Sequence, residues 1–187
     1  MKLNPRITLL FIASVCALPV LASYLTFHLA PPEGRMNYGE LLPPAPLSAL
    51  PMQTAEGKAW SVSSLKGRWV LLQAGGGPEC DPDCRDALHL SRQVRTAVGK
   101  EVERVERLWL IPPGARLDPA LLAEHPGLHV ARVAGEATAG FPLAREGRAQ
   151  LYLVDPLGNL VLRYPAEPEG RRVLKDLERL LKYSRVG

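Results

Sequence analysis

The side chains best suited to reversible chemistry are those of Cys80 and Cys84, which form a Cys-x-x-x-Cys motif. Residues four apart lie on one face of a helix, so the two sulfur atoms are expected to lie side by side. Such a pair can form a reversible disulfide, or it can hold one soft metal ion between two thiolates. A structural disulfide that only closes a turn is the alternative, although cross-linking so short a loop adds little stability.

The residues around this motif predict a junction between a strand and a helix. Residues 69–74 form an apolar run, which is typical of a strand buried on both faces, and glycines follow at residues 75–77. Pro82 is tolerated in the first turn of a helix, and Asp81 and Asp83 suit the positive end of the helix dipole. The cysteines are therefore expected where the buried strand ends and a helix begins.

Two opposing effects act on the pKa values of these cysteines. The nearby carboxylates of Glu79, Asp81 and Asp83 disfavour the thiolate forms. The N-terminus of a helix favours them. The sequence therefore does not predict strongly activated cysteines, but a thiolate pair still suits Cu(I), which is a soft ion.

The composition is that of an ordinary globular chain with one appendage. The chain has 187 residues, of which 47% are hydrophobic and 22% charged, with a net charge of +4. The basic residues are dispersed until the C-terminus and do not alternate with aromatic residues, which argues against nucleic-acid binding. Cys16 lies in the apolar N-terminal run and is expected to pack there. The remaining cysteine pair cannot make a four-thiolate zinc site.

The N-terminal region is predicted to be a membrane anchor followed by a tether. An uncharged apolar run is long enough to cross a bilayer, and Lys2 and Arg6 before it favour a cytoplasmic N-terminus. A signal peptide cleaved after Ala22 is the rival interpretation. We predict a single-pass protein of the cell inner membrane with a periplasmic C-terminal domain. Its predicted parts are a cytoplasmic N-terminus at residues 1–6, a transmembrane anchor at 7–30, a proline-rich tether at 31–51 and a folded domain at 52–187.

Alternating strand and helix signals predict an α/β domain. A strand, a long helix and a second strand in succession indicate a parallel pair. The expected elements are a hairpin at residues 50–54 and 59–62, strands at 69–74, 107–111 and 128–133, helices at 85–100, 117–124 and 169–183, and a final hairpin at 150–154 and 160–164. This order resembles that of a thioredoxin-like fold, in which helices flank a central mixed sheet.

Three features of the sequence resemble the Sco/SenC family of membrane-anchored cytochrome c oxidase assembly factors. The first is the apolar anchor with its proline-rich tether. The second is the segment at residues 64–72, Ser-Leu-Lys-Gly-Arg-Trp-Val-Leu-Leu, leading into Cys80 and Cys84. The third is the segment at residues 151–159, Leu-Tyr-Leu-Val-Asp-Pro-Leu-Gly-Asn, which is similar to the family's final hairpin.

The resemblance implies a copper site and a partner. Members of the family bind copper through both motif cysteines and a histidine, and they deliver copper to, or reduce the thiols of, the dinuclear copper site of oxidase subunit II. Cys80 and Cys84 would then be the catalytic and Cu(I)-binding residues. The histidine position falls at about Gly147, and no histidine follows His129. His129 is thus the remaining candidate for a third ligand, since His89 is expected to point away from the thiol face.

Two functions of different classes follow from these features. One is a thiol–disulfide reductant or Cu(I) carrier in oxidase assembly, acting through Cys80 and Cys84. The other is a docking or scaffold subunit of an assembly complex, which has kept the fold and lost the chemistry. The missing histidine and the acidic residues around the motif favour the second.

Overall fold

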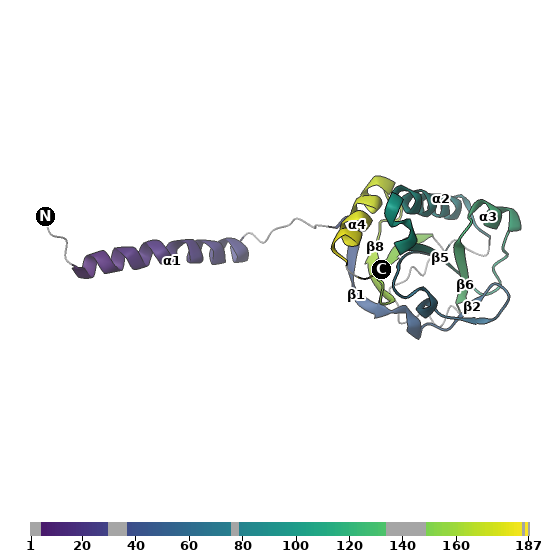
Figure 1. The fold of residues 1–187 in the computed structure, drawn as a ribbon, viewed down its shortest axis with the longest axis horizontal. Coiled ribbons are helices and arrows are strands. Elements are labelled where there is room, and N and C mark those ends of the chain that lie inside the picture. The colour runs from purple at the N-terminus through teal and green to yellow at the C-terminus, as the bar shows by residue number, and fades with distance from the viewer. Residues whose placement is uncertain (1–4, 30–36, 76–78, 134–148, 185, 187) are drawn as a thin grey trace. The chain divides into compact units, whose positions relative to one another are not determined.

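The computed structural model describes residues 5–29, 37–75, 79–133, 149–184 and 186. The chain divides into two compact units, Met1–Met36 and Asn37–Gly187. The first unit contains helix α1, and the second contains the sheet and the other described helices (Figure 1). Each unit is described by itself.

Helix α1 (Pro5–Leu29) is long and apolar enough to cross a membrane. Its 25 residues correspond to a length of about 38 Å, which exceeds the hydrocarbon thickness of a bilayer. Its window Pro5–Thr26 contains no buried residue and has a mean hydropathy of 2.1. Signal sequences near an N-terminus meet the same two criteria, so α1 agrees with either interpretation of residues 7–30. Cys16 lies exposed on this helix rather than packed against other residues.

The folded unit is built on one mixed sheet, which confirms the predicted thioredoxin-like fold. The sheet has eight described strands. Its strand order is β1-β8-β7-β4-β5-β6-β2-β3. At its centre, β4 and β5 are parallel, as are β5 and β6, whereas β7 pairs with β4 in the antiparallel direction. The strands are β1 (Glu40–Pro46), β2 (Met52–Thr54), β3 (Ala59–Trp60), β4 (Trp69–Ala74), β5 (Val105–Ile111), β6 (Leu128–Val133), β7 (Gln150–Val154) and β8 (Asn159–Arg163).

Helices cover one face of this sheet, and short helical turns cover the other. Helix α2 (Pro82–Ala97) and helix α4 (Gly170–Tyr183) lie side by side, and both pack on β4, β7 and β8 (Figure 1). Helix α3 (Pro119–Glu124) adds Leu121 to the cluster below α2. On the opposite face, the 3₁₀ turns η1 (Leu47–Ala49) and η2 (Val62–Leu65) pack against β4, β5 and β7. Strand β4 is thus buried on both sides, as its apolar sequence predicts.

The predicted tether at residues 31–51 is wrong over its second half. Residues 40–46 form β1, which pairs with β8 at the edge of the sheet, and the folded unit begins at Asn37 instead of residue 52. The pairing is irregular between Leu41 and Ala45, where two prolines lie. Proline lacks a backbone N–H group, so it is confined to edge strands and bulges. A proline-rich stretch therefore served here as an edge strand.

A buried carboxylate ties this N-terminal segment to the last helix. Asp176 of α4 is 3% exposed and accepts hydrogen bonds from the backbone N–H groups of Tyr38, at 2.8 Å, and Gly39, at 2.9 Å. The Tyr38 hydroxyl accepts a hydrogen bond from the backbone N–H of Glu169, and its ring lies 4.0 Å below the guanidinium carbon of Arg172. These contacts make residues 37–46 part of the folded unit.

Candidate functional site

The two motif cysteines are joined by a disulfide at the N-terminus of α2. Their Cα atoms lie 5.3 Å apart. Only Cys84 belongs to the helix, because α2 begins at Pro82 and Cys80 lies in the turn before it. The two sulfur atoms are therefore brought together by the turn and not by one helical face. The motif lies between the end of β4 and the start of α2, where the sequence predicted it.

The sequence between the cysteines starts the helix. Asp81 is the N-cap residue, and its carboxylate accepts a hydrogen bond of 2.8 Å from the backbone N–H of Cys84. Pro82 follows at the first helical position, where its missing N–H group leaves no hydrogen bond unmade. This cap fixes the backbone of Cys84 in the first turn of α2.

Gln73 of β4 contacts Cys84 directly, and sequence reasoning missed it. Its side-chain nitrogen lies 3.2 Å from the carbonyl oxygen of Cys84 and 3.4 Å from its sulfur. The residue is 1% exposed, and its side-chain oxygen has no hydrogen-bond partner among the residues that the structure describes. The signal was available, since Gln73 is the polar residue in an otherwise apolar buried strand.

The two sulfur positions differ in access. Cys84 is 0% exposed and belongs to the cluster between α2 and the sheet, whereas Cys80 is half-buried and packs at the margin of that cluster. Cys80 also lines a cavity of about 290 Å³, next to Arg85 and Asp118, whose charged groups lie 3.7 Å apart. A partner can therefore reach Cys80 and cannot reach Cys84.

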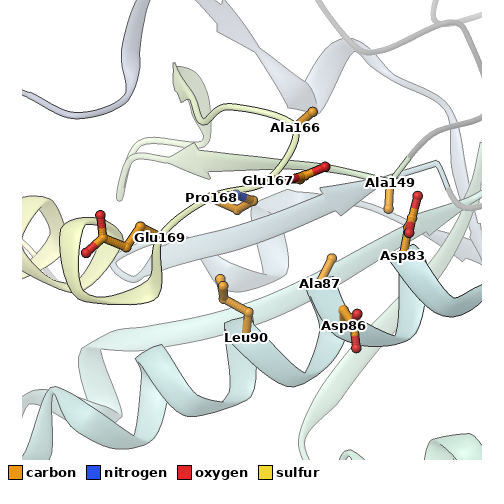
Figure 2. Close-up of a pocket in the computed structure, with 9 residues that line it drawn as sticks. All are labelled: Asp83, Asp86, Ala87, Leu90, Ala149, Ala166, Glu167, Pro168 and Glu169. Carbon is orange, nitrogen blue, oxygen red and sulfur yellow. The ribbon is translucent and has the colours of Figure 1, made fainter.

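The surface on the other side of the first turns of α2 is anionic. A cavity of about 520 Å³ lies between this part of α2 and the segment that leads into α4. Asp83 and Asp86 line it from α2, and Glu167 and Glu169 line it from the opposite segment (Figure 2). The predicted acidic environment of the motif is thus extended by residues far away in the sequence.

The structure does not bring His129 to the cysteines. Its ring stacks on Trp60 with 6.2 Å between ring centroids, and its Nε2 atom lies 3.5 Å from the carboxylate of Glu106. Its neighbour Val130 packs in the cluster that contains Cys84, and alternate residues of a strand face opposite sides of the sheet. His129 therefore lies on the face away from α2, which disagrees with its expected candidacy as a third ligand.

The other positions considered for a histidine ligand do not supply one either. His89 is exposed on α2 and pairs with the side chain of Gln93 at 2.8 Å. His28 lies near the end of α1. Gly147, where the resemblance places the ligand, lies outside the described residues. Within the described ranges, no group of three or more histidine, cysteine or acidic residues could hold a metal ion.

His125 lies in a second buried polar cluster, beneath α2 and away from the disulfide. Burial lowers its pKa, and the positive charges of Arg107 and Arg92 lower it further. Arg107 of β5 is 2% exposed, and burial lowers its pKa to about 10. Its Nη2 atom donates a hydrogen bond of 2.7 Å to the carbonyl oxygen of Pro126. The arginines make this cluster cationic, in contrast to the anionic surface beside the motif.

The fold and the site together define a thioredoxin-like protein with a dithiol–disulfide pair at its first strand-to-helix junction. Residues 69–184 match the family described as the transmembrane-like, thioredoxin-like, C-terminal domain. The chain belongs to this family. The family and the apolar helix α1 both indicate membrane anchoring. No curated protein matches the sequence.

Solved structures with the same fold include Sco proteins and a DsbF homologue. Apo Sco1 from Thermus thermophilus is 23% identical, with a TM-score of 0.58, 79% of this chain and 99% of that chain being covered. Copper-bound yeast Sco1 is 16% identical, with a TM-score of 0.57 and coverage of 81% and 96%. A DsbF homologue from Corynebacterium diphtheriae is 12% identical, with a TM-score of 0.58 and coverage of 80% and 96%. The likeness to Sco proteins confirms the predicted fold resemblance.

Proposed function

We propose that this protein is a membrane-anchored thioredoxin-like factor in the assembly of the copper site of cytochrome c oxidase, acting through dithiol chemistry at Cys80 and Cys84. One observation carries the proposal: the two sulfur atoms are paired at the end of β4, and one is accessible while the other is buried. A disulfide that only closed a four-residue turn would need no such difference in access. The fold shared with Sco1 proteins supports the biological context.

In the proposed reaction, the reduced protein transfers two electrons to a disulfide of its partner. The Cys80 thiolate attacks one partner sulfur, so the partner's S–S bond breaks and a mixed disulfide forms. The second partner sulfur leaves as a thiolate. Cys84 then attacks the Cys80 sulfur of the mixed disulfide, which releases the reduced partner and closes the Cys80–Cys84 disulfide. The partner gains two electrons and, on protonation, two protons.

We propose oxidase subunit II as the partner, because its copper-binding thiols must be reduced before they bind copper. An extracytoplasmic dithiol protein would reduce Cys80 and Cys84 again after each reaction. This scheme requires α1 to remain uncleaved in the inner membrane, with its N-terminus in the cytoplasm and the folded unit in the periplasm. Lys2 and Arg6 support that orientation.

Cu(I) is proposed as a second cargo of the same site. In the reduced protein, the two thiolates would offer Cu(I) the soft, low-coordinate ligand set that it prefers. Anaerobic titration of the reduced full-length chain should show one Cu(I) bound per chain, and Cys84→Ser should abolish tight binding. Retained binding in this variant would contradict a role for the thiol pair in copper transfer.

A trapping experiment tests the thiol reaction. We expect reduced Cys84→Ser protein to accumulate a mixed disulfide with oxidised subunit II, because the resolving thiol is missing. Reduced Cys80→Ser protein should accumulate at least about tenfold less, because the remaining thiol is buried and only the exposed thiolate is reactive. Non-reducing electrophoresis measures both products. Equal trapping by the two variants, or trapping by neither, would contradict the proposed mechanism.

The second candidate function is a docking or scaffold subunit of an assembly complex. Two observations favour it: the absence of a three-ligand metal group among the described residues, and the anionic cavity formed by Asp83, Asp86, Glu167 and Glu169. A strain in which both motif cysteines are serine distinguishes the two functions. Loss of oxidase activity in that strain supports dithiol chemistry, whereas wild-type activity supports the scaffold.

A further inference from the structure

Gln73 is an unusual residue for its position. It lies in β4 between Leu72 and Ala74, with 1% of its surface exposed, and every other residue of this strand is apolar. Burying an amide is unfavourable unless its hydrogen bonds are made. Within the described residues, the side-chain oxygen of Gln73 has no partner, so no contact there offsets its part of this cost. An apolar residue of the same size would fit the surrounding core better.

The one partner residue of the Gln73 side chain, in the part of the chain that the structure describes, is Cys84. The amide nitrogen lies 3.4 Å from the buried Cys84 sulfur and 3.2 Å from its carbonyl oxygen. Asp81 holds the Cys84 backbone through its cap hydrogen bond. The amide is therefore held against the sulfur that the solvent cannot reach.

We propose that Gln73 is a positioning residue that stabilises the reduced form of Cys84 and thereby sets the reduction potential of the Cys80–Cys84 pair. This inference rests on the proposed function, because it requires a disulfide that is reduced and formed again. The amide meets a weakly polar disulfide sulfur in the oxidised protein. It meets a thiolate or a thiol in the reduced protein, and both of these form stronger hydrogen bonds.

The amide can serve both protonation states of Cys84. Its N–H group donates to the thiolate, where the negative charge strengthens the hydrogen bond. Rotation of the amide about its last torsion angle exchanges the positions of its nitrogen and oxygen. The oxygen, for which the described part of the oxidised protein supplies no partner, then accepts a hydrogen bond from the Cys84 thiol. Reduction of the disulfide thus supplies the partner that Gln73 lacks in the oxidised state.

This arrangement has a chemical consequence in each direction of exchange. When the disulfide is reduced, an external thiolate attacks Cys80, the S–S bond breaks, and its electron pair leaves on Cys84. Gln73 stabilises that leaving thiolate at a buried position. When a mixed disulfide on Cys80 is resolved, the same thiolate is the nucleophile. Lowering its pKa increases the fraction that can react.

The test replaces Gln73 with methionine, which has a similar volume and cannot donate this hydrogen bond. The full-length chain is equilibrated in detergent with mixtures of reduced and oxidised dithiothreitol. We expect the equilibrium to shift about tenfold toward the disulfide in Gln73→Met, because hydrogen bonds to charged groups are among the strongest in proteins. A tenfold change corresponds to a reduction potential about 30 mV more negative. A change of less than twofold, or a change in the opposite direction, would overturn the proposal.

A matched control separates tuning of the sulfur from general loss of packing. Ser91 is 2% exposed on α2, and its hydroxyl donates to the carbonyl oxygen of Leu88, away from both cysteines. Ser91→Ala perturbs the helix that contains Cys84 and should leave the equilibrium constant with dithiothreitol within twofold of the wild-type value. If Ser91→Ala shifts the potential as much as Gln73→Met, the effect is one of packing, and the proposal fails.

A measurement on the wild-type chain keeps the inference testable if Gln73→Met does not fold. The side-chain amide resonances of Gln73 are followed by ¹⁵N-edited NMR in oxidised and reduced protein. We expect them to shift on reduction and again as the Cys84 thiol titrates; resonances that do neither overturn the inference. If the wild-type disulfide resists physiological dithiols altogether, the proposed function fails. A wild type that is reduced normally, with Gln73→Met unchanged, refutes only the role of Gln73.

Discussion

At the scale of single residues, the difference between Cys80 and Cys84 results from where helix α2 begins. The cap formed by Asp81 places Cys84 inside the first turn, beneath which the sheet packs. Cys80 precedes the helix and remains half-buried at the surface. Thiol–disulfide exchange requires a line of approach to one sulfur, and this difference in access is the reason why we propose Cys80 as the attacking thiol. Gln73 then acts on the sulfur that stays inside.

His125 provides a test of residue-scale electrostatics. Because burial and nearby arginines lower its folded-state pKa below 6.5, the unfolded chain binds a proton first as the pH falls. The free energy of unfolding should therefore decrease as the pH falls from 6.5 to the folded-state pKa of His125. Above pH 7.5, His125 should cause no pH dependence of this free energy. Urea unfolding between pH 5 and pH 8 measures it.

The comparison variant for this prediction is His125→Gln, which keeps a polar side chain and removes the titration. It should flatten the pH dependence of stability below pH 6.5. His89→Gln changes an exposed histidine on α2 that makes the smallest contribution to the lowered His125 pKa, so it should alter the pH dependence much less than His125→Gln. A pH dependence that is identical in wild type and His125→Gln would contradict the assigned cause.

At the scale of elements, two helices begin with the same aspartate–proline cap. Asp81 caps α2 and Asp118 caps α3, each accepting a backbone hydrogen bond. The two caps differ in which backbone group they bind, since Asp81 accepts from the N–H of Cys84 itself, whereas Asp118 accepts from that of Ala120 and lines the cavity beside Cys80. A comparison of the two therefore separates a general capping effect from a chemical one.

We expect Asp81→Ala and Asp118→Ala each to reduce stability by about 1 kcal/mol, the usual cost of losing a side-chain cap. Asp81→Ala alone should also lower the pKa of the Cys84 thiol in the reduced protein, because a negative charge beside the helix N-terminus is removed. Thermal unfolding measures the change in stability, and the ultraviolet absorbance of the thiolate, followed as a function of pH, measures the thiol pKa. A raised thiol pKa in Asp81→Ala would contradict this electrostatic account.

At the scale of the whole molecule, residues 37–46 complete the sheet. Strand β1 covers the edge of β8, and the Asp176 carboxylate accepts hydrogen bonds from the backbone N–H groups of Tyr38 and Gly39. Without this segment, the carboxylate would lose its buried partners and β8 would become an exposed edge, which promotes aggregation. The proline-rich composition of β1 also protects the new edge, because its prolines cannot donate hydrogen bonds to another strand.

A pair of truncated chains tests this role. A chain that begins at residue 37 should be soluble and unfold cooperatively. A chain that begins at residue 52 should be less stable by several kcal/mol, on the order of 2 to 5, because a buried charge loses its partners, and it should aggregate. Calorimetry and sedimentation measure the difference. Equal stability of the two chains would show that residues 37–51 are the tether that their composition suggests.

Most elements could be predicted because their signals are local. The strands at residues 69–74, 107–111 and 128–133 are short apolar runs bounded by glycines and prolines, and the structure confirms them, with β5 beginning two residues earlier. The final hairpin was also recognisable from residue type, and the structure confirms it, with Asp155 bonding the backbone of Asn159 across the turn. Strand β1 was missed because its pairing with β8 joins residues more than a hundred positions apart, and proline-rich stretches are typical of linkers.

The amino-acid sequence by itself determined the chemistry available to this protein: two cysteines one turn apart, after a buried strand, in a chain with an apolar N-terminal helix. These are properties of residue type and spacing, so no folding is needed to see them. Only the tertiary structure decided which sulfur is accessible, that Gln73 contacts the other, and that His129 faces away. These properties depend on which face of the sheet each side chain occupies and on what packs above it, and both are set by contacts between residues distant in the chain.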